Sequence, residues 1–385
     1  MSDGPVDVSV LVTTYRRPRH LALALESLAL QRGVDGTMEV VVSDDGSGDE
    51  TPQVVRSFAA TAPFPVRFTS QPHDGFRLAR VRNAAARLAT GRYLLFLDGD
   101  CMVPRHHVAA HVSRRRHGTA LLGYCARLPA EANPILVPEN LAVTNLAGLV
   151  SAAERRSLAR RRRKAWWHAI TRHPTKPRLA GGDFGVWRND FEQVNGFDER
   201  FVGWGQEDDD LGLRLRAAGV RLETILGLTH SLHVWHETDA TATPRWRDGV
   251  NVRYFERRGR LTACRQGLVP RPAATITWGL PTDLMATPLG RSVATHLAGA
   301  TIAAPGEPCE IDLVIRPGTG RFTREAECRL ALVVPDQRGQ PDQRGQPNQL
   351  QQLNQRRQER LDHGADVTVT VFADDEIAAA LAAAG

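Results

Sequence analysis

The sequence predicts an α/β fold in which strands and helices alternate to form a mostly parallel sheet flanked by helices. Apolar runs of strand length occur at four places, 8–12, 38–43, 66–69 and 93–97. Between them, leucines recur at helical spacing at 21, 25 and 28, and 78–90 forms a second predicted helix. Polar segments follow three of the strands, at 13–16, 44–47 and 98–100. Since ligands bind at the carboxyl ends of strands in such sheets, these segments predict a ligand site.

A second organised block extends from Leu179 to Leu226. It opens on a glycine-rich predicted strand, LAGGDFGVW, and continues into FVGWGQEDDDLGLRLRAAG, in which four acids begin a predicted helix. The length favours one large domain with a smaller appendage, and we expect these at 1–265 and 266–385. Three strand-like runs make the appendage β-rich, at 311–315, 330–334 and 367–372. A low-complexity loop is expected at 336–358, where DQRGQP occurs twice.

The composition excludes several classes of protein. Of the 385 residues, 42% are apolar and 24% are charged, which is typical of a globular protein and not of a disordered one. No apolar run has the roughly 18 residues that a membrane span requires, and the first residues lack a signal-peptide pattern. We therefore expect a cytoplasmic protein. Five cysteines without CxxC spacing argue against a disulfide framework and predict reduced thiols.

The chain is basic, with a net charge of +6. Such a balance suits nucleic acid, anionic lipid or a phosphate-bearing substrate. Its most concentrated source is the arginine-rich segment 155–164, which Trp166 and Trp167 follow. We expect this run to form one face of an amphipathic helix, which argues against a nucleic-acid partner. Such a helix can lie peripherally on the inner face of a membrane or bind an acidic acceptor.

Asp98-Gly99-Asp100 is the sharpest short motif. It directly follows the apolar run YLLFL, and carboxylates at the end of a buried strand need a reason, because unpaired charge near a core is unfavourable. Two carboxylates one residue apart can both face one hard cation such as Mg²⁺ or Mn²⁺, and that cation can bridge to a diphosphate. The alternative is an ordinary solvated turn.

His233 and His236 are the second element, three residues apart in LHVWHETD. Either one alone is more often a structural histidine. Joined to the two aspartates, they would complete a mixed carboxylate and imidazole site, for which Mn²⁺ is the expected ion. His230 is the weaker candidate.

Four consecutive acids, 207–210, form the third element. Acids in a first helical turn favour the helix dipole and can act as caps, but four exceed what capping requires. One of them can take a proton from an attacking hydroxyl. Just before them, Trp204 and Gly205 offer an aromatic face suited to a sugar ring, with core packing as the alternative for the tryptophan.

Two further sets of polar residues are expected at the carboxyl ends of the predicted strands or close to them. Asp44 and Asp45 precede Gly46-Ser47 in a turn that can hold a base or ribose, although an ordinary turn would have the same sequence. Arg77, Arg80 and Arg82 surround a helix start, where they either meet a diphosphate or are solvated.

Taken together, these motifs resemble family-2 glycosyltransferases of the GT-A fold, a Rossmann-like architecture. The resemblance rests on VSVLVTTYRRPRHLALALESL, VVVSDDGSGDET and RVRNAAARLATGRYLLFLDGD, followed by Cys-Met-Val-Pro. The later block GGDFGVWRNDFEQVNGFDERFVGWGQEDDDLGLRLRAAG resembles the acceptor-side segment of β-1,4-galactosyltransferases and of chondroitin-polymerase-type N-acetylgalactosaminyltransferases. Together the two matches cover roughly residues 6–260.

The resemblance implies roles for matching residues. It makes 1–125 the nucleotide-sugar half and 175–260 the acceptor and catalytic half. Asp208 matches the family's catalytic base, with Glu207 as substitute, and the metal ligands would be Asp98, Asp100, His236 and His233. The family's Met-x-x-His stands here as His233-x-x-His236, which makes His233 the less certain ligand. Residues expected at the nucleotide are Thr13, Thr14, Tyr15, Arg16, Asp44, Asp45, Arg82, Asn83, Asp98 and Gly99. Residues expected at the sugar or acceptor are Gly182, Asp183, Trp204, Gly205 and Asp209.

The expected function is therefore inverting, metal-dependent transfer of a sugar from a UDP-sugar to a hydroxyl group. The sugar is of the N-acetylgalactosamine, galactose or N-acetylglucosamine type. The acceptor can be a glycan such as a growing polysaccharide, a lipid-linked glycan, a peptide or a natural product. The alternative is a non-catalytic sugar- or nucleotide-binding protein on a transferase fold. A dinucleotide-dependent oxidoreductase is disfavoured because Thr-Thr-Tyr-Arg-Arg, and no GxGxxG, follows the first strand. A sugar nucleotidyltransferase would need a glycine-rich triphosphate loop near the N-terminus, and none is evident.

Overall fold

The computed structural model describes residues 6–237, 249–256, 259–316, 322, 324–333, 365–371 and 376–383. These residues form two compact units. The first comprises residues up to Phe255 together with Gln266–Leu268, and the second comprises Glu256–Arg265 and the residues from Val269 onward. The low-complexity segment 336–358 lies outside the described residues.

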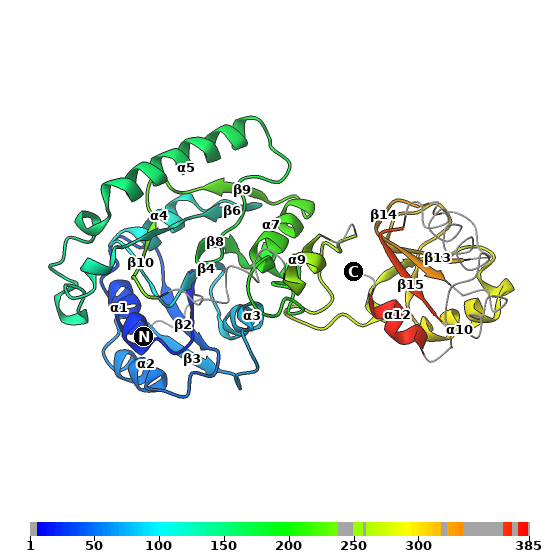
Figure 1. The fold of residues 1–385 in the computed structure, drawn as a ribbon, viewed down its shortest axis with the longest axis horizontal. Coiled ribbons are helices and arrows are strands. Elements are labelled where there is room, and N and C mark those ends of the chain that lie inside the picture. Colours follow the sequence, from blue (N-terminus) through cyan, green and yellow to red (C-terminus); the bar gives the residue numbers. More distant parts are fainter. Residues whose placement is uncertain are drawn as a thin grey trace, which may run out of the picture. The chain divides into compact units, whose positions relative to one another are not determined.

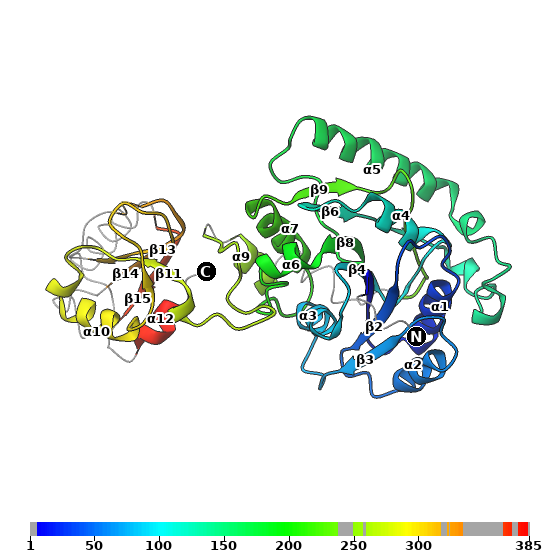
Figure 2. The same cartoon turned by 180° about the vertical axis from the view of Figure 1, so that it is seen from behind.

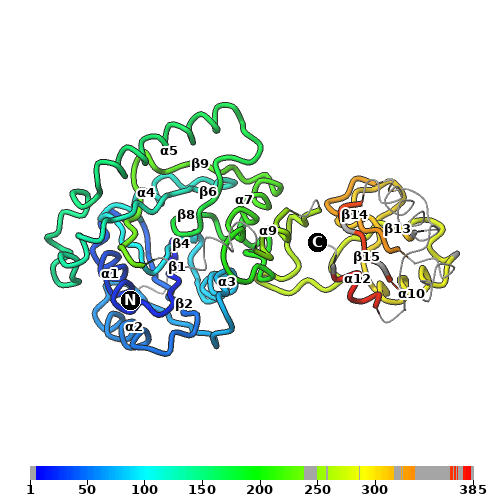
Figure 3. The backbone as a smooth tube through the Cα atoms, viewed as in Figure 1, coloured from blue at the N-terminus to red at the C-terminus, as the bar shows by residue number. Residues whose placement is uncertain are grey.

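A seven-stranded sheet forms the centre of the first unit, with the order β3-β2-β1-β4-β8-β6-β9. Its strands are β1 (Val8–Thr14), β2 (Met38–Asp44), β3 (Val66–Ser70), β4 (Tyr93–Asp98), β6 (Thr119–Leu122), β8 (Asp183–Trp187) and β9 (Arg221–Thr224). All neighbours are parallel except β8, which runs antiparallel to both β4 and β6. In Figure 3, β1 and β2 lie on one side of β4 and β8 lies on the other. The mostly parallel α/β fold predicted from the sequence is therefore confirmed, while the antiparallel insertion of β8 was not predicted.

Helices cover both faces of this sheet (Figures 1 and 2). The helices of the first unit are α1 (Pro18–Ala29), α2 (Thr51–Ala59), α3 (Leu78–Leu88), α4 (His107–Arg114), α5 (Ala152–Ile170), α6 (Arg188–Gln193), α7 (Glu207–Ala217) and α9 (Val250–Phe255). Alternation along β1 divides the core, because Val10 packs with α1, α2 and α4 whereas Leu11 packs with α3, α6 and α7. Each fully buried aliphatic side chain contributes about 1.5–3 kcal/mol to the stability of this core.

A second, three-stranded sheet lies at the carboxyl end of β4. It has the order β5-β10-β7, formed by β5 (Cys101–Met102), β7 (Cys125–Arg127) and β10 (Ser231–His233). In its register His233 lies opposite Cys101, next to Asp100. Short 3₁₀ turns connect β7 to α5, at Ala130–Ala132, Pro138–Asn140 and Leu146–Leu149. The sheet thus joins segments that are more than a hundred residues apart in the sequence.

The second unit contains a five-stranded parallel sheet with the order β12-β11-β13-β14-β15. Its elements are β11 (Thr277–Gly279), α10 (Pro288–His296), β12 (Thr301–Ile302), β13 (Cys309–Arg316), β14 (Ala326–Val333), β15 (Val367–Thr370) and α12 (Ile377–Ala383), with 3₁₀ turns at Ala273–Thr275 and Leu284–Ala286. Three of these strands are the runs predicted from the sequence. Trp278 is fully buried, and its indole N–H donates to the Ala273 carbonyl at 2.9 Å.

Two expectations about the surface and the thiols can be compared with the structure. All five cysteines are free, as predicted. Among the described residues, no helix is both long enough and apolar enough to cross a membrane.

The arginine-rich run lies on α5, which lies along β9 (Figures 1 and 2). Its basic residues do not form one face, because the four consecutive arginines 160–163 are all exposed and surround the helix.

Candidate functional site

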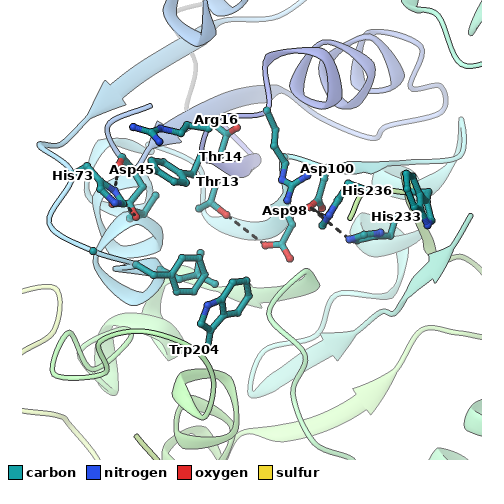
Figure 4. Close-up of a pocket in the computed structure, with 18 of the residues that line it drawn as sticks. Thr13, Thr14, Arg16, Asp45, His73, Asp98, Asp100, Trp204, His233 and His236 are labelled. Atoms are coloured by element: carbon teal, nitrogen blue, oxygen red, sulfur yellow. Dashed lines mark hydrogen bonds and ion pairs between the residues drawn. The ribbon is translucent and has the colours of Figure 1, made fainter. Parts of the chain in front are cut away.

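A cavity of about 1030 Å³ opens where β1, β4 and the small sheet end (Figure 4). Most of the predicted nucleotide and metal residues line it. Those residues are Thr13, Thr14, Tyr15, Arg16, Asp45, Asp98, Gly99, Asp100, His233 and His236, and Trp204, predicted at the sugar or acceptor, lines it as well. Carboxylates, imidazoles, a guanidinium and aromatic rings therefore face one space, which is wide enough for a ligand with several chemical parts.

One end of the cavity is aromatic. The rings of Tyr15 and His73 stack with centroids 4.4 Å apart and an interplanar angle of 11°. His73 Nδ1 bonds the Asp45 carbonyl at 3.0 Å and lies 3.8 Å from the Asp45 carboxylate, on the same side of the cavity as Arg16 in Figure 4. Burial raises the pKa of Asp45, although hydrogen bonds from Gln71 and from the Arg77 N–H oppose this rise. This end thus offers a flat ring surface next to hydrogen-bond acceptors.

Asp44 does not line the cavity, although Asp45 does. Its carboxylate is buried and accepts from the Ser47 hydroxyl, the Ser47 N–H at 3.0 Å and the Ser70 hydroxyl at 2.8 Å. The Ser47 hydroxyl in turn accepts from the Arg16 N–H at 2.8 Å, where Arg16 has a positive φ of 48°. Asp44 therefore shapes the loops that carry Tyr15 and Asp45.

Gly99 brings the two aspartates against the end of β1. Its N–H donates to the Thr13 carbonyl at 2.7 Å, and a Cβ at this position would lie 2.8 Å from that same carbonyl oxygen. Asp98 Oδ1 accepts from Arg82 Nη2 at 3.2 Å and from the Thr13 hydroxyl at 3.5 Å. Burial raises the pKa of Asp98 to about 6, against the opposing charge of Arg82.

Asp100 lies with the two histidines on the opposite side of the cavity from Asp45 (Figure 4). His236 Nε2 is 3.2 Å and His233 Nε2 is 3.6 Å from Asp100 Oδ2, and one ligand atom from each of the three residues lies within 4.8 Å of the others. Burial alone would raise the pKa of Asp100, but the hydrogen bond from His236 and the charges of both histidines hold it at about 2. His230 does not belong to this group of ligand atoms. We call Asp100, His233 and His236 the exposed cluster, because each is partly accessible.

Arg82 links this edge to the four acids on α7. Its guanidinium is 2% exposed and bonds Asp208 Oδ1 at 2.6 Å, Asp98 Oδ1 at 3.2 Å and Glu207 Oε1 at 3.4 Å. Asp208 Oδ2 also accepts from the Gly181 N–H at 2.8 Å, an approach that a Cβ on Gly181 would block. Arg82 was predicted as a nucleotide contact, whereas here it holds carboxylates from two different segments in fixed positions.

The four acids have different surroundings. Asp208 keeps 27% of its side chain exposed although it does not line the cavity, whereas the Glu207 side chain is 7% exposed. Burial, with the neighbouring charge of Asp208, raises the pKa of Glu207 to about 8, and its Oε2 makes no hydrogen bond. Asp209 pairs with Arg178 at 3.1 Å, and Asp210 is fully buried against Arg214 at 2.7 Å. The last of the four is thus structural.

Trp204 lines the cavity beside Phe76, with centroids 4.3 Å apart and the rings nearly parallel at 16°. Asn251 holds the neighbouring backbone, donating to the carbonyls of Trp204 at 3.3 Å and Gly205 at 3.0 Å. Phe76 and His73 were not predicted as site residues, since both lie in an irregular loop after β3 that carries no motif.

Asn83, Gly182 and Asp183 also lie outside the cavity lining, as do Asp44, Arg82, Gly205 and the acids at the start of α7. Asn83 is fully buried and bonds Phe197 and Glu199, so its side chain is already occupied within the protein. The Gly182 carbonyl accepts from the Asp98 N–H at 3.3 Å, behind the aspartate. Asp183 is fully buried and faces the histidines of α4. Its expected role at the sugar or acceptor has no support in this geometry.

Comparison with known families agrees with this arrangement of the first unit. Residues 9–130 match the model for glycosyl transferase family 2, and residues 167–237 match the N-terminal domain of galactosyltransferase. The first unit is a glycosyltransferase domain whose residues 9–130 match family 2. The two matched segments of this glycosyltransferase domain contain the Asp98–Asp100 motif and the Glu207–Asp210 run, respectively.

Relatives with assigned activities match part of the chain. The chain is 34% identical over 235 residues to validoxylamine A glucosyltransferase of Streptomyces hygroscopicus subsp. limoneus, which covers 55% of this chain and 48% of the relative. It is 26% identical over 242 residues to chondroitin synthase of Escherichia coli, covering 57% of this chain and 34% of the synthase. The chain thus spans about half or less of the length of these relatives.

Among solved structures, the chain is similar to a mannosyltransferase from Pyrobaculum calidifontis in complex with GDP-Man and Mn²⁺. The identity is 22% and the TM-score is 0.42, over 62% of this chain and 60% of that one.

Proposed function

We propose that the protein transfers a sugar from a UDP-sugar to a hydroxyl acceptor, with inversion and with a divalent cation. One observation supports this most directly: a single cavity carries stacked aromatic rings and acceptors on one side and a carboxylate with two imidazoles on the other. A nucleoside needs the first set, and the metal-bridged diphosphate of a nucleotide sugar needs the second.

The exposed cluster is suited to hold the cation. Carboxylate and imidazole ligands suit Mn²⁺, and all three side chains project into the cavity where a diphosphate can reach them. Bound there, a divalent cation would neutralise the charge that develops on the leaving diphosphate. Asp98 is held by Arg82 and Thr13 at the same edge, within reach of the ribose or the cation.

At the nucleoside end, Tyr15 and His73 present a preformed ring surface against which a base can stack. Asp45 offers carboxylate acceptors to the base or to the ribose hydroxyls. Asp44 supports this end through its bonds to Ser47, so we propose it as a positioning residue and not as a direct contact.

Asp208 is the proposed base. Arg82 and the Gly181 N–H each take one lone pair of its carboxylate, which leaves further lone pairs to accept the proton of an attacking hydroxyl. The two bonds fix the direction of the carboxylate, and Arg82 couples it to Asp98 on the donor side. Trp204 can stack on a sugar ring at the cavity wall. Attack from the face opposite the diphosphate inverts the anomeric configuration.

A donor panel tests this function. Purified full-length protein is mixed with UDP-glucose, UDP-galactose and the two UDP-N-acetylhexosamines in Mn²⁺, and UDP release and product formation are measured; UDP-glucose is included because a relative is named as a glucosyltransferase. We expect turnover with one donor, retained in a Glu192→Gln control on α6. UDP binding without turnover on any donor and acceptor offered would instead support the non-catalytic alternative.

A further inference from the structure

A second group of metal-ligating side chains lies inside the glycosyltransferase domain, apart from the cavity. It consists of His107 and His111, one turn apart on α4, and Asp183, the first residue of β8. All three side chains are fully buried, and one ligand atom from each lies within 4.8 Å of the others. We call them the buried cluster. None of the three lines the cavity.

The polar atoms that meet in this cluster lack ordinary partners. His107 Nε2, both ring nitrogens of His111 and Asp183 Oδ1 are buried without a hydrogen bond. The two imidazole Nε2 atoms lie 3.2 and 3.4 Å from Asp183 Oδ1, but their directions do not meet hydrogen-bond geometry. Buried polar groups left without partners are unfavourable by about 1–3 kcal/mol each, so three convergent side chains of this kind point to a missing central group.

Two of the distances between these ligand atoms fit a tetrahedral ion. Ligand atoms about 2.0–2.1 Å from a tetrahedral zinc ion lie roughly 3.3–3.4 Å from one another. The two distances from Asp183 Oδ1 to the imidazole nitrogens match this edge length. A cation would also balance the charge of a carboxylate that is fully buried.

The surroundings hold the ligands in place. His107 uses its other nitrogen, Nδ1, to bond the Thr229 hydroxyl at 2.9 Å, which is how metal-bound histidines are usually oriented. Asp183 Oδ2 accepts from the Ser231 N–H at 3.0 Å, and Gly123 leaves space for the carboxylate where any Cβ would collide with it.

We propose that His107, His111 and Asp183 bind a zinc-class divalent cation that ties α4 to β8. A water molecule would complete the tetrahedron. The role is structural, because the cluster is sealed from the cavity. It stabilises the β8 end next to Gly182, whose carbonyl accepts from the N–H of Asp98. The competing arrangement is a proton on His107 that pairs with Asp183 and leaves no room for a cation.

The test uses Co²⁺, whose visible absorption is intense in tetrahedral sites, in full-length protein carrying His236→Ala to disable the exposed cluster. We expect one equivalent of tightly bound Co²⁺, displaced by Zn²⁺, and a rise in the unfolding midpoint on loading. Adding His111→Gln should abolish the absorption. Adding His106→Gln, which changes the exposed neighbouring histidine on the same turn, should leave it intact.

A second, milder variant keeps the test decisive if the His111→Gln protein misfolds. Thr229→Val keeps the side-chain volume and removes the partner of His107 Nδ1, so the affinity for Co²⁺ should fall about 10- to 100-fold. No Co²⁺ binding in the His236→Ala protein, or an unfolding midpoint that does not respond to loading, would overturn the proposal in favour of the protonated His107 pair. Equal Co²⁺ affinity in the Thr229→Val protein would also overturn it.

Discussion

The exposed and buried clusters contain the same kinds of ligand in opposite environments. Asp100, His233 and His236 lie at the wall of a cavity, where a substrate can add its own oxygens to a bound ion. His107, His111 and Asp183 are enclosed, so an ion there can reach no substrate. Ligand chemistry alone therefore does not distinguish a catalytic metal site from a structural one. Access to the cavity distinguishes the two clusters.

The largest effect is expected from removing the carboxylate of the exposed cluster. Asp100→Ala should lower turnover about 1000-fold or more, because several kcal/mol of stabilisation of the leaving diphosphate are lost. The unfolding midpoint should change little, since this side chain is not part of a hydrophobic core. Turnover within tenfold of wild type would remove the exposed cluster from the reaction.

Asp208→Asn should also lower turnover, by about 100- to 10,000-fold, because the amide can still accept from Arg82 but cannot take a proton. UDP binding, measured by calorimetry, should remain close to wild type, in contrast to Asp100→Ala. A loss of turnover that is entirely explained by weaker donor binding would contradict the role of base.

A chelator should remove metal from the two clusters at different rates. Brief treatment with a chelator should remove the ion from the exposed cluster and stop turnover, with full recovery in Mn²⁺, while the metal in the buried cluster is retained for much longer. Metal content and activity followed together over hours give the two rates. Equal rates of loss would mean that the clusters do not differ in access as the structure indicates.

Glu207 provides a smaller effect that depends on pH. Its pKa is raised from 4.5 to about 8, chiefly by burial and then by the charge of Asp208, with Asp98 adding to the rise and Arg82 opposing it. A raised pKa means that the folded state retains a proton that the unfolded state loses. Its stabilisation is therefore complete below about pH 4.5 and is lost as pH rises towards 8. Glu207→Gln should flatten this part of the stability curve by up to a few kcal/mol, as urea unfolding between pH 5 and 8 would measure. An unchanged slope would contradict the shifted pKa.

Much of the site was predictable because the carboxyl ends of parallel strands meet at one edge. This rule predicted that Thr13, Asp45 and Asp98 lie together, and the His-x-x-His spacing identified the segment that reaches Asp100. The apolar runs predicted the four main strands of the first hundred residues within a few positions.

Other features depend on contacts that local sequence does not encode. The position of the Asp183 side chain depends on β8 running antiparallel beside β4, with Asp183 opposite Leu97. The sequence indicated neither this strand pairing nor the face of the sheet on which Asp183 lies. The convergence of the α4 histidines on Asp183 could not be predicted, because Asp183 lies some seventy residues later in the sequence. Arg82 was selected for a phosphate, and only the fold shows that three carboxylates already surround it.

The central claim is that the exposed cluster and the nucleotide share one cavity, and calorimetric UDP binding with and without Mn²⁺ tests it most directly. In wild type, Mn²⁺ should tighten UDP binding at least tenfold, and UDP should tighten Mn²⁺ binding by the same factor. In Asp100→Ala both effects should vanish. Mn²⁺-independent UDP binding in wild type, or the same enhancement in Asp100→Ala, would contradict it.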